Sequence, residues 1–231
     1  MAGFIIGFGL WLMGVGRQQL SNFRRSLSDQ RQFSILLYWL LTVLLLVFGY
    51  WSIAIQPLGH GLSRIQGDLG DARFNNYILE HDHLWLTGKE KSLLDAPFFY
   101  PYPKTVAYSE NHFGSMLFYS AFRSMGLDRE TAFQYWFLLG YLLCLITVVV
   151  VLQKMKLHPL AIGLGAFIFT FSLPVLAQED HAQLVYRFCI PLALYSLWQW
   201  MNHQKAKHLL LMTFWWVWQF YLSIYLGFFL T

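Results

Sequence analysis

The chain has 231 residues, of which 57% are hydrophobic and only 12% are charged, against roughly 25% charged residues in an ordinary soluble domain. A soluble domain of this length has no means of keeping so much apolar surface from water. Despite the net charge of +4, nucleic acid is not an expected partner, because no basic face is interleaved with stacking aromatic side chains. The composition therefore predicts an all-α integral membrane protein, in contact with membrane lipids.

Five strongly apolar segments are expected to cross the membrane, since about 20 apolar residues are needed for one helical span. They are residues 33–55, 131–152, 159–177, 184–200 and 208–231. Residues 1–16 are apolar but short for a span, which leaves the number at about five to six. The prediction is a multi-span helical bundle that forms one transmembrane domain over residues 1–231. Because the last segment ends without a polar cap, we expect the chain to be incomplete at its C-terminus.

The positions of the basic residues predict the orientation. Lys and Arg are concentrated in residues 17–31, 154–156 and 203–208, and an even number of spans separates each of these segments from the next. All three are therefore expected on one side, which the positive-inside rule makes cytoplasmic. The long loop 56–130 and the polar patch 178–183 then share the outer face.

The outer loop is predicted to contain a helix that begins at Asp71. From there the spacing of apolar residues becomes helical, so that Phe74, Tyr77, Ile78 and His81 share one face. Asp71 would lie at the positive end of the helix dipole. Two interpretations remain open at this point, because Asp is favoured as a helix cap and an outer Asp with His neighbours also suits acid–base chemistry.

Acidic and histidine side chains crowd the rest of the outer face. Such side chains act together as general bases or as ligands of a divalent cation, and they also occur in ordinary solvated turns. The candidates for a polar or metal-binding cluster are Glu80, His81, His83, Glu110, His112, Asp180 and His181.

Aromatic residues mark the same loop as a segment near the membrane surface. Residues 98–104 contain two prolines among Phe and Tyr, which favours an extended stretch at the interface. The apolar run 113–122 is too short to span a bilayer. We therefore expect a large outer first loop with short interfacial helices.

The pattern Asp71-Ala72-Arg73-Phe74, placed just after the first long span, resembles the Asp-x-Arg-aromatic motif in the first outer loop of GT-C superfamily glycosyltransferases. These include the lipid A aminoarabinose transferases and the protein O-mannosyltransferases. Residues 98–114 and 181–191 also look like parts of bacterial relatives. Several members have Asp-Glu where this chain has Asp71-Ala72, and members are longer, with more spans and often a soluble C-terminal part.

The resemblance implies a bacterial inner-membrane enzyme of the cell envelope. Its donor would be a polyprenyl-phosphate sugar, transferred with inversion at the outer face, and the sugar and acceptor stay open. Asp71 matches the position of the catalytic base. Arg73 and Arg187 are the candidates for gripping the donor phosphate, since Arg binds phosphate oxygens bidentately. Asp68 is a secondary candidate, because a Gly-Asp-x-Gly turn also explains it.

Two other function classes compete with a glycosyltransferase. A transporter or flippase-like protein would favour charges inside the spans, and the span interiors hold little beyond Gln134 and Gln219. A non-catalytic membrane assembly subunit would suit the short chain.

Overall fold

The computed structural model describes residues 17–67, 70–178 and 180–231, and all regular structure in these ranges is helical, which confirms the all-α prediction. Three helices are long and apolar enough to cross a membrane, namely Gln32–Leu62, Arg129–Lys154 and Pro159–Leu176. The number of five to six spans is not confirmed. Helices α8 (Cys189–His203) and α9 (Ala206–Leu222) have 15 and 17 residues, fewer than the about 20 of a usual span. Residues 1–16 lie outside the described ranges.

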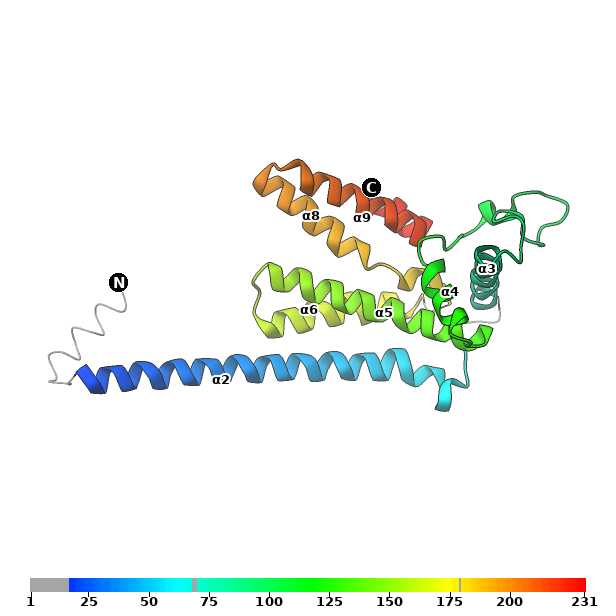
Figure 1. Cartoon of the computed structure of the whole chain (residues 1–231). Coiled ribbons are helices and arrows are strands. Elements are labelled where there is room, and N and C mark those ends of the chain that lie inside the picture. Colours follow the sequence, from blue (N-terminus) through cyan, green and yellow to red (C-terminus); the bar gives the residue numbers. More distant parts are fainter. Residues whose placement is uncertain (1–16, 68–69, 179) are drawn as a thin grey trace.

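Helix α2 (Arg17–Gly49) runs along one side of the bundle (Figure 1) and continues as the π-helical segment η1 (Tyr50–Ile55) and the short η2 (Gln56–Leu58). Its apolar side chains largely face outward, as with Leu36 at 68% exposure. Its neighbour is α6 (Pro159–Phe171), where the Thr42 hydroxyl donates to the Pro159 carbonyl at 2.8 Å. Exposed apolar residues on so long a helix agree with a lipid environment.

Helix α5 (Arg129–Lys154) forms an antiparallel hairpin with α6 and carries the core of the protein. Trp136 and Tyr141 are buried against Phe171 and Tyr186. The candidate span Pro159–Leu176, which matches the predicted run 159–177, is interrupted at Ser172, where the backbone is extended between α6 and the four-residue α7 (Leu173–Leu176).

The last two predicted spans also differ from the structure. Residues 184–188 belong to the short η5 (Ala182–Val185) and a turn, so that α8 begins later than expected. The run 208–231 is broken at Ser223, whose backbone is extended (φ −157°, ψ 121°), into α9 and the short α10 (Ile224–Phe229). The break is held by the outer loop, because Glu110 accepts hydrogen bonds from the Ser223 hydroxyl and the Ile224 N–H.

The basic segments lie at one end of the bundle and the outer-loop elements at the other (Figure 1). The α5–α6 and α8–α9 turns share the first end, which the N-terminal part of α2 also reaches. Helices α3 (Asp71–Leu86) and α4 (Met116–Ser124) occupy the second end. The even number of spans between the basic segments predicted that all three lie at one end. The assignment of this end to the cytoplasm stays a prediction.

Helix α3 begins at Asp71, as the spacing predicted. Its apolar face of Phe74, Tyr77 and Ile78 packs with Ala96 and Val106 from the following loop.

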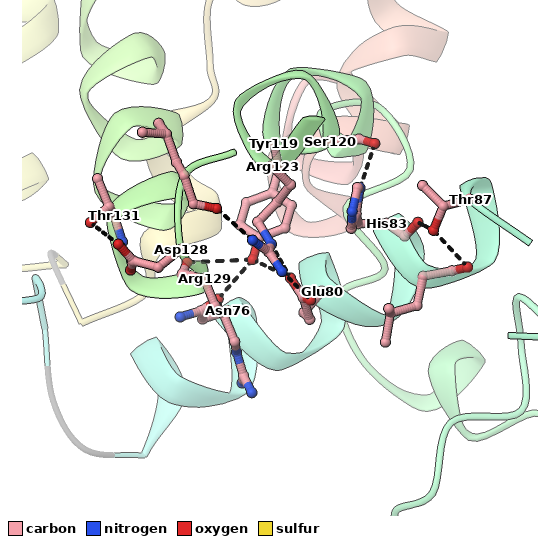
Figure 2. Close-up of polar contacts among 12 residues, drawn as sticks. Asn76, Glu80, His83, Thr87, Tyr119, Ser120, Arg123, Asp128, Arg129 and Thr131 are labelled. Atoms are coloured by element: carbon pink, nitrogen blue, oxygen red, sulfur yellow. Dashed lines mark hydrogen bonds and ion pairs between the residues drawn. The ribbon is translucent and has the colours of Figure 1, made fainter. Parts of the chain in front are cut away.

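A polar network fixes the opposite side of α3 (Figure 2). Glu80 receives two hydrogen bonds from Arg123 of α4, at 2.8 and 2.9 Å, and one from the Tyr119 hydroxyl at 2.7 Å. Burial raises the pKa of Glu80, but the hydrogen bonds from Arg123 and Tyr119 outweigh it and lower the pKa overall. Asp128, just before α5, caps that helix by accepting from the Thr131 N–H. Helix α3 is thereby held rigidly against α4 and the start of α5.

Candidate functional site

The first turn of α3 borders a cleft of about 800 Å³ at the outer-loop end of the bundle. Its other walls are residues 107–110 of the outer loop, residues 178, 181, 183 and 184 of the polar patch and η5, and α10. Four segments far apart in the sequence therefore meet here. The cleft is large enough for a small-molecule ligand, since such sites typically measure about 300–1,000 Å³.

Asp71 and His181 form a polar pair at this cleft. The Oδ2 atom of Asp71 lies 2.7 Å from the Nδ1 atom of His181, and the contact becomes an ion pair when the imidazole is protonated. Their side chains are 54% and 44% exposed, so both reach solvent and any bound ligand. An exposed carboxylate whose second oxygen has no partner among the described residues is able to accept a proton, and the imidazole orients it.

The floor of the cleft is formed by two buried amides, which were not among the site residues predicted from the sequence. Asn75 and Gln183 are 3% and 7% exposed, and the Asn75 Nδ2 donates to the Gln183 Oε1 at 2.9 Å. Behind them lies His112, fully buried, with its Nε2 at 2.7 Å from the Asn75 Oδ1. Asn75 lies one helical turn after Asp71, so helical spacing was a signal for it. Gln183 follows His181 by two residues, and no pattern marked it.

Glu110 lines the cleft but already has a structural role. Its carboxylate accepts from the Ser223 hydroxyl at 3.0 Å and from the Ile224 N–H at 2.9 Å. Burial raises the pKa of Glu110 more than these hydrogen bonds lower it. Glu110 therefore joins the outer loop to the start of α10 and shapes one wall of the cleft.

Most members of the predicted polar or metal-binding cluster have a hydrogen-bond partner outside the cluster, and the binding of a cation stays a prediction. Glu80 pairs with Arg123, His83 with Ser120, His81 with the Leu93 carbonyl, His112 with Asn75, Glu110 with Ser223 and His181 with Asp71, while Asp180 is exposed. Within residues 17–67, 70–178 and 180–231, no group of three or more His, Cys, Asp or Glu is placed to hold a metal ion.

The two arginines expected at the donor phosphate lie outside the cleft wall. Arg187 is 8% exposed, and its guanidinium donates to the carbonyls of Leu184 and Thr170 at 3.2 and 3.0 Å. Arg73 is exposed on the first turn of α3, two residues after Asp71. Asp68, the secondary candidate, lies outside the described residues.

Asp82, in the middle of α3, is a buried acid that was not among the site residues predicted from the sequence. It is fully buried, and neither carboxylate oxygen has a hydrogen-bond partner among the described residues. Burial raises the pKa of Asp82 to about 8, so the group is largely protonated at neutral pH.

A shallow aromatic groove of about 520 Å³ adjoins the cleft. It is lined by Phe99, Tyr100, Tyr102 and Tyr108, which are 59%, 94%, 67% and 62% exposed. Tyr108 belongs to both the groove and the cleft, so a ligand that extends from the cleft would meet these rings.

Compared with known protein families, with curated proteins and with solved structures, the chain matches none of them.

Proposed function

We propose that this chain is a membrane glycosyltransferase, or part of one, that transfers a sugar from a polyprenyl-phosphate donor to an acceptor at the outer face of a bacterial inner membrane. The observation that carries the proposal is the pair of Asp71 and His181 at the mouth of a ligand-sized cleft. Asp71 is also the residue that matches the base in the motif shared with the GT-C superfamily.

The position of the cleft supports a lipid-linked donor. It lies at the end of the bundle where the long apolar helices α2 and α5 meet the outer loop. A polyprenyl-phosphate sugar, anchored by its chain in the bilayer, presents its sugar at this level. The aromatic groove extends the site and offers rings for the acceptor.

Transfer with inversion needs one base and no covalent intermediate. The acceptor hydroxyl attacks the anomeric carbon while the bond to the lipid phosphate breaks, and the phosphate leaves with the bonding electrons. Asp71 accepts the hydroxyl proton as the new bond forms. His181 donates to Asp71 and keeps one carboxylate oxygen directed at the acceptor.

The developing charge on the lipid phosphate needs a cation. Arg73 is our proposed ligand, because the resemblance pairs it with Asp71 and its side chain is exposed, and Arg grips phosphate oxygens bidentately. Arg73 does not line the cleft, so the phosphate would bind beside the cleft and the sugar within it. Arg187 would first have to leave the carbonyls of Leu184 and Thr170. A divalent cation brought in with the phosphate is a second source of charge.

The test of the enzyme is transfer from radiolabelled polyprenyl-phosphate sugars in membranes that contain the full-length gene product. Asp71→Asn keeps the size of the side chain and removes its charge, so transfer should fall by ~100- to ~10,000-fold with unchanged expression. Asp68→Asn should cost far less, and Glu90→Gln, an exposed acid of the same loop, serves as the matched control. Near-normal transfer by Asp71→Asn would refute the assignment.

We further propose that the α8–α9 hairpin also enters the membrane, which would restore the expected five to six spans. Single cysteines at the exposed positions Asp95 and Lys205 test the resulting topology, because the native Cys144 and Cys189 are buried. In intact spheroplasts an impermeant maleimide should label position 95 and spare position 205. Labelling of position 205 without lysis would overturn the orientation.

A further inference from the structure

The hydrogen bonds that join His112, Asn75 and Gln183 at the floor of the cleft all run in one direction, so that each residue donates to the next. Asn75 donates through its Nδ2 to the Gln183 Oε1 at 2.9 Å. The amide oxygen of Asn75 therefore faces His112, and the 2.7 Å contact requires that the His112 Nε2 carries the hydrogen and donates it. Each group thus fixes the orientation of the next one.

The environment of His112 keeps this direction constant. Its ring is fully buried and packs edge-on against Trp136, with centroids 5.4 Å apart. The Nδ1 atom has no partner among the described residues, so a second proton there would be a buried, unpaired donor. Burial lowers the pKa of His112 to about 3, and the ring stays neutral with its single hydrogen on Nε2.

The last member of the line is Gln183 on η5, at the cleft surface. Its Oε1 is engaged by Asn75. Gln183 lines the cleft at 7% exposure, and its Nε2 is not one of the fully buried atoms that lack a partner. The N–H at the end of the line therefore stays accessible from the cleft, where an acceptor on a ligand can take the place of water.

We propose that Gln183 is a specificity-determining residue, held by Asn75 and His112 so that its amide N–H donates to a hydroxyl oxygen of the sugar bound in the cleft. The inference rests on the proposed function for the identity of the ligand as a lipid-linked sugar. It adds a residue that recognises the sugar itself, separately from the base and from the phosphate. Sites built to hydrogen-bond a substrate hydroxyl discriminate strongly against ligands that lack it.

Two nearly isosteric substitutions remove the donor in different ways. In Gln183→Glu the carboxylate still accepts from Asn75 but offers no N–H to the cleft. In Asn75→Asp both oxygens are acceptors, so Gln183 must turn its Nε2 toward residue 75 and its carbonyl toward the cleft. A purely structural role for Asn75 would not produce the same change in sugar recognition as Gln183→Glu.

The experiment measures binding to the full-length protein in nanodiscs. The probes are undecaprenyl phosphate and undecaprenyl phosphate carrying glucose, mannose or galactose. The measured quantity is the ratio of affinities for the sugar-bearing and the bare lipid, which cancels changes in phosphate binding. Gln56→Glu, at an exposed residue that does not line the cleft, places the same new charge away from the hydrogen-bonded line. Gln183→Met, neutral and of similar length, is measured in parallel in case the charged variant fails to insert.

We expect the wild-type protein to prefer at least one sugar-bearing lipid. Gln183→Glu, Gln183→Met and Asn75→Asp should each reduce this preference about tenfold, the loss of roughly one hydrogen bond. The double variant Gln183→Met with Asn75→Asp should lose no more than either single variant, and Gln56→Glu should keep the preference. An unchanged preference in the Gln183 variants, or a wild-type protein without preference, overturns the inference.

The outcomes separate this inference from the proposed enzyme. Sugar transfer without any preference that depends on Gln183 leaves the enzyme standing and refutes the role of Gln183. A preference that depends on Gln183, in a protein that transfers no sugar, supports the role of Gln183 and refutes the enzyme.

Discussion

The acidic side chains in the middle and at the start of helix α3 have contrasting environments. In the middle, Glu80 has a 14% exposed side chain and receives three hydrogen bonds from Arg123 and Tyr119. At the start, the Asp71 side chain is 54% exposed, and its polar contact among the described residues is with His181. The first arrangement stabilises the helix, whereas the second leaves a carboxylate accessible. One helix thus carries both the support of the candidate site and the base that we propose.

The largest stability loss is expected from Glu80→Gln. The substitution removes the charge that Arg123 and Tyr119 share and leaves the guanidinium, 23% exposed, without its partner. The free energy of unfolding should fall by roughly 2–3 kcal/mol, the range for lost hydrogen bonds to a charged group, because the pair is only partly buried. Thermal unfolding of the purified protein in one detergent measures it, and Glu90→Gln is the control. A melting temperature equal to that of the control would mean that the network does not hold α3.

Gly114→Ala should disturb the packing of the outer loop against the end of α9. A Cβ atom at Gly114 would lie 2.7 Å from backbone atoms of Tyr221 and Leu222. Unlike the end of a flexible side chain, these backbone atoms cannot rotate away from it. The expected loss is about 1–3 kcal/mol. Gly165→Ala is the matched control, because its Cβ would meet only the flexible end of Leu152. Equal melting temperatures of the two variants would contradict the close approach.

Burial of Asp82 should make the protein less stable as the pH rises, whereas the paired Glu80 should make it less stable as the pH falls. The folded pKa of about 8 lies above the ordinary 3.8, so the folded state holds a proton that the unfolded state releases. The contribution of Asp82 to stability is present at low pH and is lost as the pH rises through about 8.

Asp82→Asn should remove this slope, because Asn does not ionise in either state. Between pH 5 and 8 the wild-type protein should lose stability relative to the variant, with a slope that approaches about 1.4 kcal/mol per pH unit for one proton, in melting curves recorded across that range. Glu80, with a lowered pKa, contributes above its ordinary value of 4.5 and loses that contribution as the pH falls through its folded pKa. Parallel curves for wild type and Asp82→Asn would show that Asp82 is hydrated or paired.

The smallest effect is expected at the partner of the proposed base. His181→Gln keeps a donor near Asp71 but loses the ring that orients it, so transfer should fall about tenfold, the equivalent of one neutral hydrogen bond. Initial rates at saturating donor, compared with those of Asp71→Asn, measure it. A loss as large as that of Asp71→Asn would assign the proton transfer to His181 instead.

Much of the fold was predictable because it depends on local patterns. The first three long helices follow from apolar runs, and the start of α3 at Asp71 follows from helical spacing. The break at Ser223 was not predictable, because no Pro or Gly marks it and the partner, Glu110, is 113 residues away. Long-range contacts also explain why the acids and histidines that lie close in the sequence have separate partners in the structure. Gln183 was named only as part of the polar patch 178–183, because its partner Asn75 is 108 residues away.

The most direct measurement compares melting temperature and sugar transfer in four proteins: wild type, Glu80→Gln, Asp71→Asn and the double variant. We expect Glu80→Gln to lower the melting temperature while the folded protein still transfers sugar. Asp71→Asn should abolish transfer with an unchanged melting temperature, and the double variant should show both losses independently. If Asp71→Asn transfers sugar normally, or if it lowers the melting temperature as much as Glu80→Gln does, then Asp71 is a structural residue and the cleft is not the catalytic site.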